Sequence, residues 1–136
     1  MRITAEQARD FEARGLIAPQ PKRKPAHTHG VMNGVEREWA EALNDRLASG
    51  KIRGWKFEAV KLVVAPAMSG GKRMTFTPDF LVWELDGTLS LEETKGGFIR
   101  DDAAAKLRLV PRIFPEFRFR LCQKVRGVWR VEEVRA

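Results

Sequence analysis

Two alternating apolar runs, one on each side of Asp86-Gly87, constrain this chain more than any other feature of its sequence. The Asp-Gly pair favours the tight turn of a β-hairpin, because the central positions of that turn need a positive φ. The run before the turn covers residues 74–85, with an irregularity at Pro78, and the run after it covers residues 88–95. The sequence therefore predicts two antiparallel strands joined at this turn.

Charged residues lie at the neighbouring ends of these two strands. Strand alternation places Asp79 on one face of the first strand and Glu93 with Lys95 on one face of the second. The other residues on these two faces are apolar, so we expect the faces to be buried: Leu81, Trp83, Leu85, Leu89 and Leu91. The charged side chains can form an ordinary cross-strand ion pair. Two adjacent carboxylates, however, repel each other unless a cation lies between them, and hard divalent cations prefer carboxylate oxygens.

The rest of the chain predicts an α/β fold around the hairpin. Asn33 and Glu36 have the spacing of a capping box, and an apolar stripe follows them as far as Ser49-Gly50. The predicted order is a helix, three strands, a helix and a strand, with these bounds: helix 33–49, strands from Trp55, from Met74 and from Thr88, helix 101–111 and strand 117–122. Residues 127–134 form a tail that suits one more strand.

The first 32 residues have a different character from the rest. Thr4 and Gln7 again have capping-box spacing, which predicts a short helix over residues 4–14. A proline-rich segment follows, with the basic cluster Lys22, Arg23 and Lys24, and it predicts an extended arm. We therefore divide the chain into an N-terminal helix and arm, 1–32, and a single domain, 33–136. The arm can cross a phosphate backbone or serve only as a solvated linker.

The charge is strongly basic and unevenly distributed. The formal net charge is +7, and residues 95–136 hold 11 of the 25 basic side chains but only five of the 18 acidic ones. An excess of this kind favours a polyanionic partner, above all nucleic acid. One cysteine excludes an internal disulfide, and no apolar run is long enough to cross a membrane, so we expect a cytoplasmic protein.

The charged residues of the hairpin resemble a known motif. Pro78-Asp79, thirteen residues and then Glu93-Thr94-Lys95 resemble the PD-(D/E)xK pattern of the restriction-endonuclease-like nucleases, whose core is a helix, three strands, a helix and a strand. The strings TFTPDFLVWELDG, LEETKGGFIRDDAAAK and IFPEFRF are similar to small phage and prophage proteins related to Holliday-junction resolvases of the bacteriophage endonuclease I type. The resemblance covers roughly residues 33–121. It implies a mixed sheet flanked by helices.

The resemblance also implies roles for individual residues. Asp79 and Glu93, with the backbone carbonyl of Thr94, would bind Mg²⁺ or Mn²⁺, and Lys95 would position the hydrolytic water or stabilise charge on the phosphate. Glu36 would complete the site, although its place in a capping box explains it equally well. Glu92 faces the other side of its strand and is not expected to be a ligand.

We expect Arg100 and Lys106 to hold phosphate, with a solvated helix face as the alternative. Together these features predict a metal-dependent DNA endonuclease, and the resemblance adds branched DNA as a candidate substrate. The related resolvases are dimers, which makes a homodimer possible, and a phage-encoded protein would act in the bacterial host cytoplasm. The alternative is a non-catalytic basic nucleic-acid-binding protein whose carboxylates only pair with lysines.

Overall fold

The computed structural model describes residues 30–65, 73–97 and 101–135, together with Glu6, Arg14, Gly71 and Ile99. The N-terminal helix and arm expected over residues 1–32 therefore lie almost entirely outside the described residues. The described elements follow one another in this order: α2 (Gly34–Ala48), β1 (Ile52–Phe57), β2 (Leu62–Ala65), β3 (Met74–Phe76), β4 (Phe80–Glu84), β5 (Leu89–Gly96), α3 (Asp101–Ile113), β6 (Arg118–Val125) and β7 (Val128–Val134).

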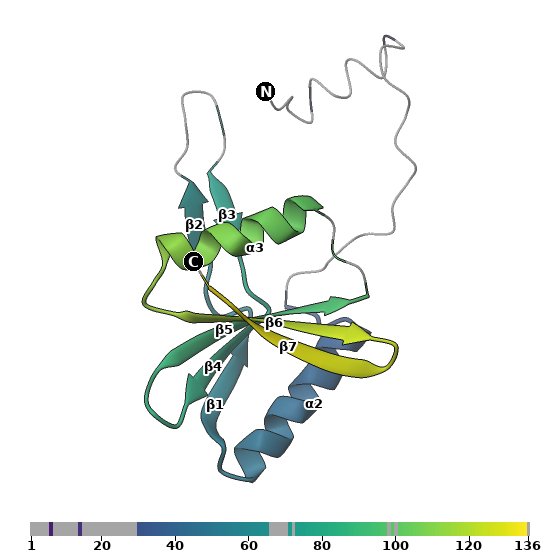
Figure 1. Ribbon diagram of the computed structural model, residues 1–136, viewed down its shortest axis with the longest axis vertical. Coiled ribbons are helices and arrows are strands. Elements are labelled where there is room, and N and C mark those ends of the chain that lie inside the picture. The colour runs from purple at the N-terminus through teal and green to yellow at the C-terminus, as the bar shows by residue number, and fades with distance from the viewer. Residues whose placement is uncertain are drawn as a thin grey trace.

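The protein is an α/β fold with two described helices, a mixed five-stranded sheet and a separate two-stranded hairpin. The sheet has the order β1-β4-β5-β6-β7, and all its neighbours are antiparallel except β5 and β6. The parallel pair needs a crossover connection, which α3 supplies. Helices α2 and α3 lie on opposite sides of the sheet, and the β2–β3 hairpin projects beyond one end of it (Figure 1).

Each face of the sheet is covered by one helix and has its own apolar core. On one face, Trp39 and Leu43 of α2 pack with Phe80, Val82 and Cys122 of the sheet. The other core joins α3 to the sheet and to the β2–β3 hairpin, with these buried members: Leu62, Val64, Phe76, Leu91, Leu107, Val110 and Phe119. The hairpin is therefore fixed to the sheet by side-chain packing, without a shared backbone ladder.

A network of buried charges lies on the α2 side of the sheet. Glu92 is 0% exposed, accepts a hydrogen bond from Trp39 Nε1 at 2.9 Å and pairs with Arg120 at 3.1 Å. The same guanidinium contacts Glu84 at 2.5 Å, and Ser90 donates to Glu84 at 2.9 Å. Burial opposes the ionisation of Glu84, but the bonds from Arg120 and Ser90 hold its pKa below its ordinary value.

Three expectations about the strands and the second helix need correction. The first two predicted strands are each divided in two, because Glu58 adopts a φ of 48° after β1 and Pro78, which has no N–H donor, stands between β3 and β4. Pro111 lies inside α3, which continues to Ile113. The tail does form a strand, β7, paired with β6.

The expected burial of Trp83, Leu85 and Leu89 is also wrong, and Leu89 is 37% exposed. Trp83 and Leu85 are exposed to a greater extent. They are 48% and 53% exposed, because the core beneath α3 ends at Leu81 and Leu91, and the Arg53 guanidinium lies 5.5 Å from the centre of the Trp83 ring. The opposite face of β4 is the buried one.

None of the helices in the described part of the chain is long and apolar enough to cross a membrane.

The buried network yields a prediction about stability. Arg120→Ala leaves Glu92 and Glu84 without their shared cation, so we expect the free energy of unfolding to fall by about 3 kcal/mol. Arg118→Ala is the matched control, because Arg118 is exposed on the same strand, and it should change stability by less than about 0.5 kcal/mol. Urea unfolding of the two variants measures the difference. Equal losses would show that the network does not stabilise the fold.

Candidate active site

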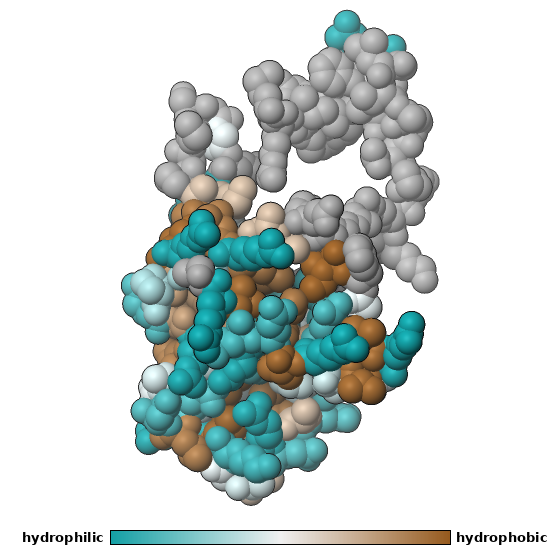
Figure 2. All heavy atoms as spheres, in the orientation of Figure 1, coloured by the Kyte–Doolittle hydropathy of each residue, from teal (hydrophilic) through white to brown (hydrophobic). Residues whose placement is uncertain are grey.

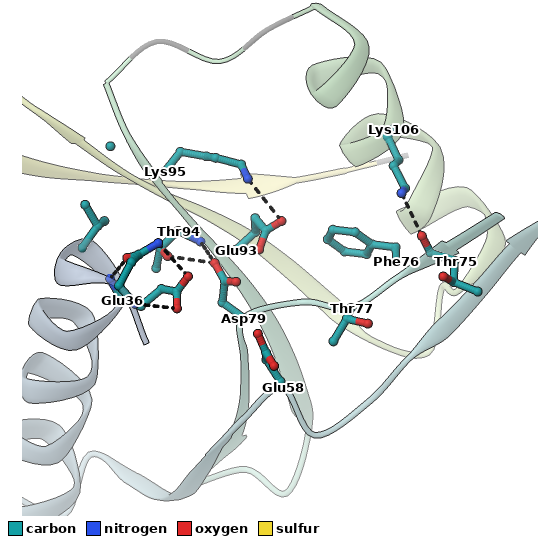
Figure 3. A pocket seen from close by; sticks show the side chains of 13 residues that line it. Glu36, Glu58, Thr75, Phe76, Thr77, Asp79, Glu93, Thr94, Lys95 and Lys106 are labelled. Atoms are coloured by element: carbon teal, nitrogen blue, oxygen red, sulfur yellow. Dashed lines mark hydrogen bonds and ion pairs between the residues drawn. The ribbon is translucent and has the colours of Figure 1, made fainter. Parts of the chain in front are cut away.

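A pocket of about 440 Å³ opens where β5 ends beside the start of α2. Its wall combines these two elements with the segment between β3 and β4, the β2–β3 hairpin and α3 (Figure 3). Gly96 allows the end of β5 to lie close to the start of α2, because a Cβ atom built there would lie only 3.0 Å from Val35 Cγ2. The pocket is lined by four carboxylate side chains and two lysines: Glu36, Glu58, Asp79, Glu93, Lys95 and Lys106.

Asp79 is fixed by the register of β4 and β5. The pairs Leu81–Leu91 and Phe80–Glu92 end the ladder, so the next position places Asp79 opposite Glu93. Both the backbone N–H and the Oγ1 hydroxyl of Thr94 donate to Asp79 Oδ2 at 2.8 Å. The structure therefore brings Asp79 and Glu93 together at the end of the hairpin, as the sequence predicts.

Glu93 lies against Asp79 and is 9% exposed. Burial, followed by the hydrogen bond and the charge of Asp79, raises the pKa of Glu93 from its ordinary value of 4.5 to about 9, against the opposing effect of Lys95. Lys95 Nζ lies 3.6 Å from Glu93 Oε2, and more than a third of the lysine side chain is exposed. The pair of carboxyls is thus only partly neutralised by the protein.

Lys106 approaches the pocket from α3, on the far wall in Figure 3. Its Nζ donates to the backbone carbonyl of Thr75 at 2.8 Å and lies 5.7 Å from the centre of the Phe76 ring. The contact places a cation beside the β2–β3 hairpin. The sequence placed Lys106 at this end of the sheet, and the structure brings it to the same pocket as Lys95.

Glu36 is buried in the pocket wall and belongs to a capping box. Its N–H donates to Asn33 Oδ1 at 2.9 Å, while its own carboxylate accepts from Asn33 Nδ2 at 2.9 Å and from the Asn33 N–H at 3.3 Å. Within the described part of the chain, no three His, Cys, Asp or Glu side chains are close enough together to form a metal cluster. Glu36 therefore lines the pocket without joining Asp79 and Glu93 in a compact three-ligand group.

The sequence did not reveal the place of Glu58 in this pocket. Its N–H donates to the backbone carbonyl of Asp79 at 2.8 Å, and its Oε2 accepts from the N–H of Gly30 at 2.8 Å. The left-handed φ of Glu58 turns the chain from β1 toward β2 and is unusual for a residue other than glycine. No local pattern signals such a turn at a glutamate, so only the structure places it here.

The remaining candidates fall into two groups. Glu92 points away from the pocket into the buried network, as expected from its position on the strand. Arg100 and the arm residues Lys22, Arg23 and Lys24 lie outside the described residues.

Comparisons of the chain with protein-family models, with curated proteins and with solved structures give no match.

The carboxyl pair predicts how stability depends on pH when divalent cations are removed. Folded Glu93 keeps its proton up to a pH of about 9, whereas unfolded Glu93 loses it near 4.5, so the stability that this proton supplies is complete below 4.5 and is lost as pH rises toward 9. In EDTA, we expect Glu93→Gln to remove more than about 1 kcal/mol of this decline. Thermal melts at several pH values measure it.

Glu41→Gln serves as the control, because Glu41 is exposed on α2 and should leave the pH dependence of stability unchanged. A Glu93→Gln variant whose stability declines with pH as steeply as that of the wild type would contradict the prediction.

Proposed function

We propose that the protein is a metal-dependent endonuclease that hydrolyses phosphodiester bonds in DNA. The observation that carries the proposal is the contact between the Asp79 and Glu93 carboxyls in a pocket that also receives Lys95. Further support comes from the order of elements around it. Helix α2, strands β1, β4 and β5, helix α3 and strand β6 follow the order expected of a restriction-endonuclease-like core.

The carboxyl pair suits a hard divalent cation such as Mg²⁺ or Mn²⁺. Both groups offer oxygen ligands, and a cation between them would oppose the burial and the charge of Asp79 that now raise the pKa of Glu93. The bonds from Thr94 hold one oxygen of Asp79 and so fix the orientation of this carboxylate. The carbonyl of Thr94 lies in the same stretch of chain and is the proposed third ligand. When bound, the cation would supply Lewis-acid stabilisation of charge on the phosphate.

The chain's own cations have separate roles in this scheme. Lys95, two residues beyond Glu93 on the same face of β5, is placed to orient the attacking water or to stabilise negative charge developing on the phosphate. Lys106 would hold a neighbouring phosphate from the opposite wall. The basic excess of the last third of the chain, including Arg100, and the cluster Lys22–Lys24 would provide sequence-independent contacts with the DNA backbone.

Cleavage of a panel of linear, nicked, flapped and four-way DNA in Mg²⁺ or Mn²⁺ tests the proposal. We expect Asp79→Ala to abolish cleavage and Lys95→Ala to slow it by about 10²–10³-fold, because the variant loses charge stabilisation in the transition state. Lys56→Ala, on the exposed edge of β1, is the matched control and should cleave like the wild type.

If the wild-type protein binds the DNA in a salt-sensitive manner but cuts none of it, the protein is a binder without catalysis. If the Asp79 and Lys95 variants cut as fast as the wild type, the pocket is not the catalytic site. A preference for the four-way substrate would support action on branched DNA.

Glu36 can be tested separately, because a glutamine keeps one of its two possible roles. Gln also fits a capping box, so Glu36→Gln should leave the melting temperature nearly unchanged. If the Glu36 charge assists cation binding, the same variant should need a higher Mg²⁺ concentration for half-maximal cleavage, by about tenfold. Glu36→Ala should lose stability as well. An unchanged Mg²⁺ requirement in Glu36→Gln would assign Glu36 to the helix cap alone.

A further inference from the structure

Strand β7 forms a free edge of the five-stranded sheet. It is the terminal strand, and within the described residues its only ladder partner is β6. The pairing runs without a register shift from Val125–Val128 to Phe119–Val134, so β7 is regular along its whole length. A regular edge strand presents a row of unpaired N–H and C=O groups to any strand that can approach it.

The opposite edge of the sheet differs. Strand β1 has a register shift between Ile52 and Gly54, and it is followed directly by Glu58, where the backbone turns left-handed. Irregularities of this kind twist an edge away from further pairing. Of the two sheet edges, β7 is therefore the one suited to accept another strand. Figure 2 shows hydrophobic side chains lying among hydrophilic ones on the part of the surface where Figure 1 draws β6 and β7.

Four side chains of β7 form matching pairs about Val131, whereas Trp129 and Glu133, two residues away on either side, differ from each other. Arg130 precedes Val131 and Glu132 follows it, and a valine lies three residues away on each side, at Val128 and Val134. Val128 and Val131 are 62% and 52% exposed, so the strand leaves apolar side chains uncovered along this edge. An antiparallel copy of the same strand centred on Val131 therefore meets a pattern complementary to its own.

We propose that β7 pairs antiparallel with β7 of a second copy of this chain, around a two-fold axis at Val131. In this register Arg130 lies opposite the partner's Glu132, and Val128 lies opposite the partner's Val134. A slip of one pair in either direction would instead place two arginines or two glutamates opposite each other, and like charges in that position destabilise a sheet. The charges therefore favour this register over the two neighbouring ones.

The resulting assembly stops at two copies, because a two-fold axis pairs the β7 edge of each copy with that of the other and leaves no β7 edge free. It extends the sheet continuously across the axis and covers the exposed valines. Since the axis reverses the strand direction, the two pockets open at opposite ends of the extended sheet. The proposal does not depend on nuclease activity, and a protein without catalysis would form the same dimer.

Charge reversal tests the pairing. Sedimentation or light scattering should show a dimer of the wild-type chain at micromolar concentration. Arg130→Glu and Glu132→Arg should each raise the dissociation constant by at least about tenfold, because each turns two attractive pairs into two repulsive ones. The double variant Arg130→Glu/Glu132→Arg restores opposite charges and should return the dimer. Both residues are exposed, so the variants should fold, which circular dichroism checks.

Lys56→Glu makes a matched charge reversal on the other edge, β1, and should leave the dimer intact. Amide exchange gives a second measurement, since amides of β7 should become more protected as protein concentration rises. A wild-type chain that stays monomeric, a double variant that fails to dimerise, or a Lys56→Glu variant that dissociates as readily as Arg130→Glu would overturn the proposal.

Discussion

The antiparallel register between β4 and β5 is the constraint on which the site depends. It sets Leu81 against Leu91 and Phe80 against Glu92, and so brings Asp79 to Glu93 at the next position. Thr94 then secures Asp79 through two hydrogen bonds. Because side chains alternate along a strand, a slip of one residue would turn Glu93 into the core and Glu92 into the pocket. The parallel pairing of β5 with β6 and the contacts of Arg120 hold this register from the other side.

The sequence was sufficient to predict both described helices, the β4–β5 hairpin and strand β6, because strong local signals mark them, but not the division that produces β2 and β3 as separate strands. Asp86-Gly87 does form the turn between β4 and β5, and the predicted capping box at Asn33 is present. The positions of Asp79, Glu93 and Lys95 followed from alternation along two strands joined by a short turn. Such features depend on neighbours in the chain, which a single sequence contains.

What the sequence could not predict depends on distant contacts. The alternating pattern predicts that Trp83 is a core residue. The core beneath α3 extends only as far as Leu81, so the Trp83 ring is exposed. The buried position of Glu84 depends on Arg120, which lies 36 residues further along the chain. Glu58 reaches the pocket through a left-handed turn that no residue pattern announces. The functional roles assigned to Lys95, Lys106 and Glu36 remain predictions, because position alone does not test them.

The acidic residues on the two faces of the β4–β5 hairpin have different surroundings. On the α2 face, Glu84 and Glu92 share the guanidinium of Arg120, which satisfies both carboxylates inside the fold. On the other face, Asp79 and Glu93 also touch, but among the described residues the cation paired with Glu93 is Lys95, at 3.6 Å and partly exposed. A carboxyl pair in this state costs folding free energy at neutral pH, because one group must keep its proton. The first pair is satisfied inside the fold, whereas the second faces the open pocket, where we propose that an additional cation binds.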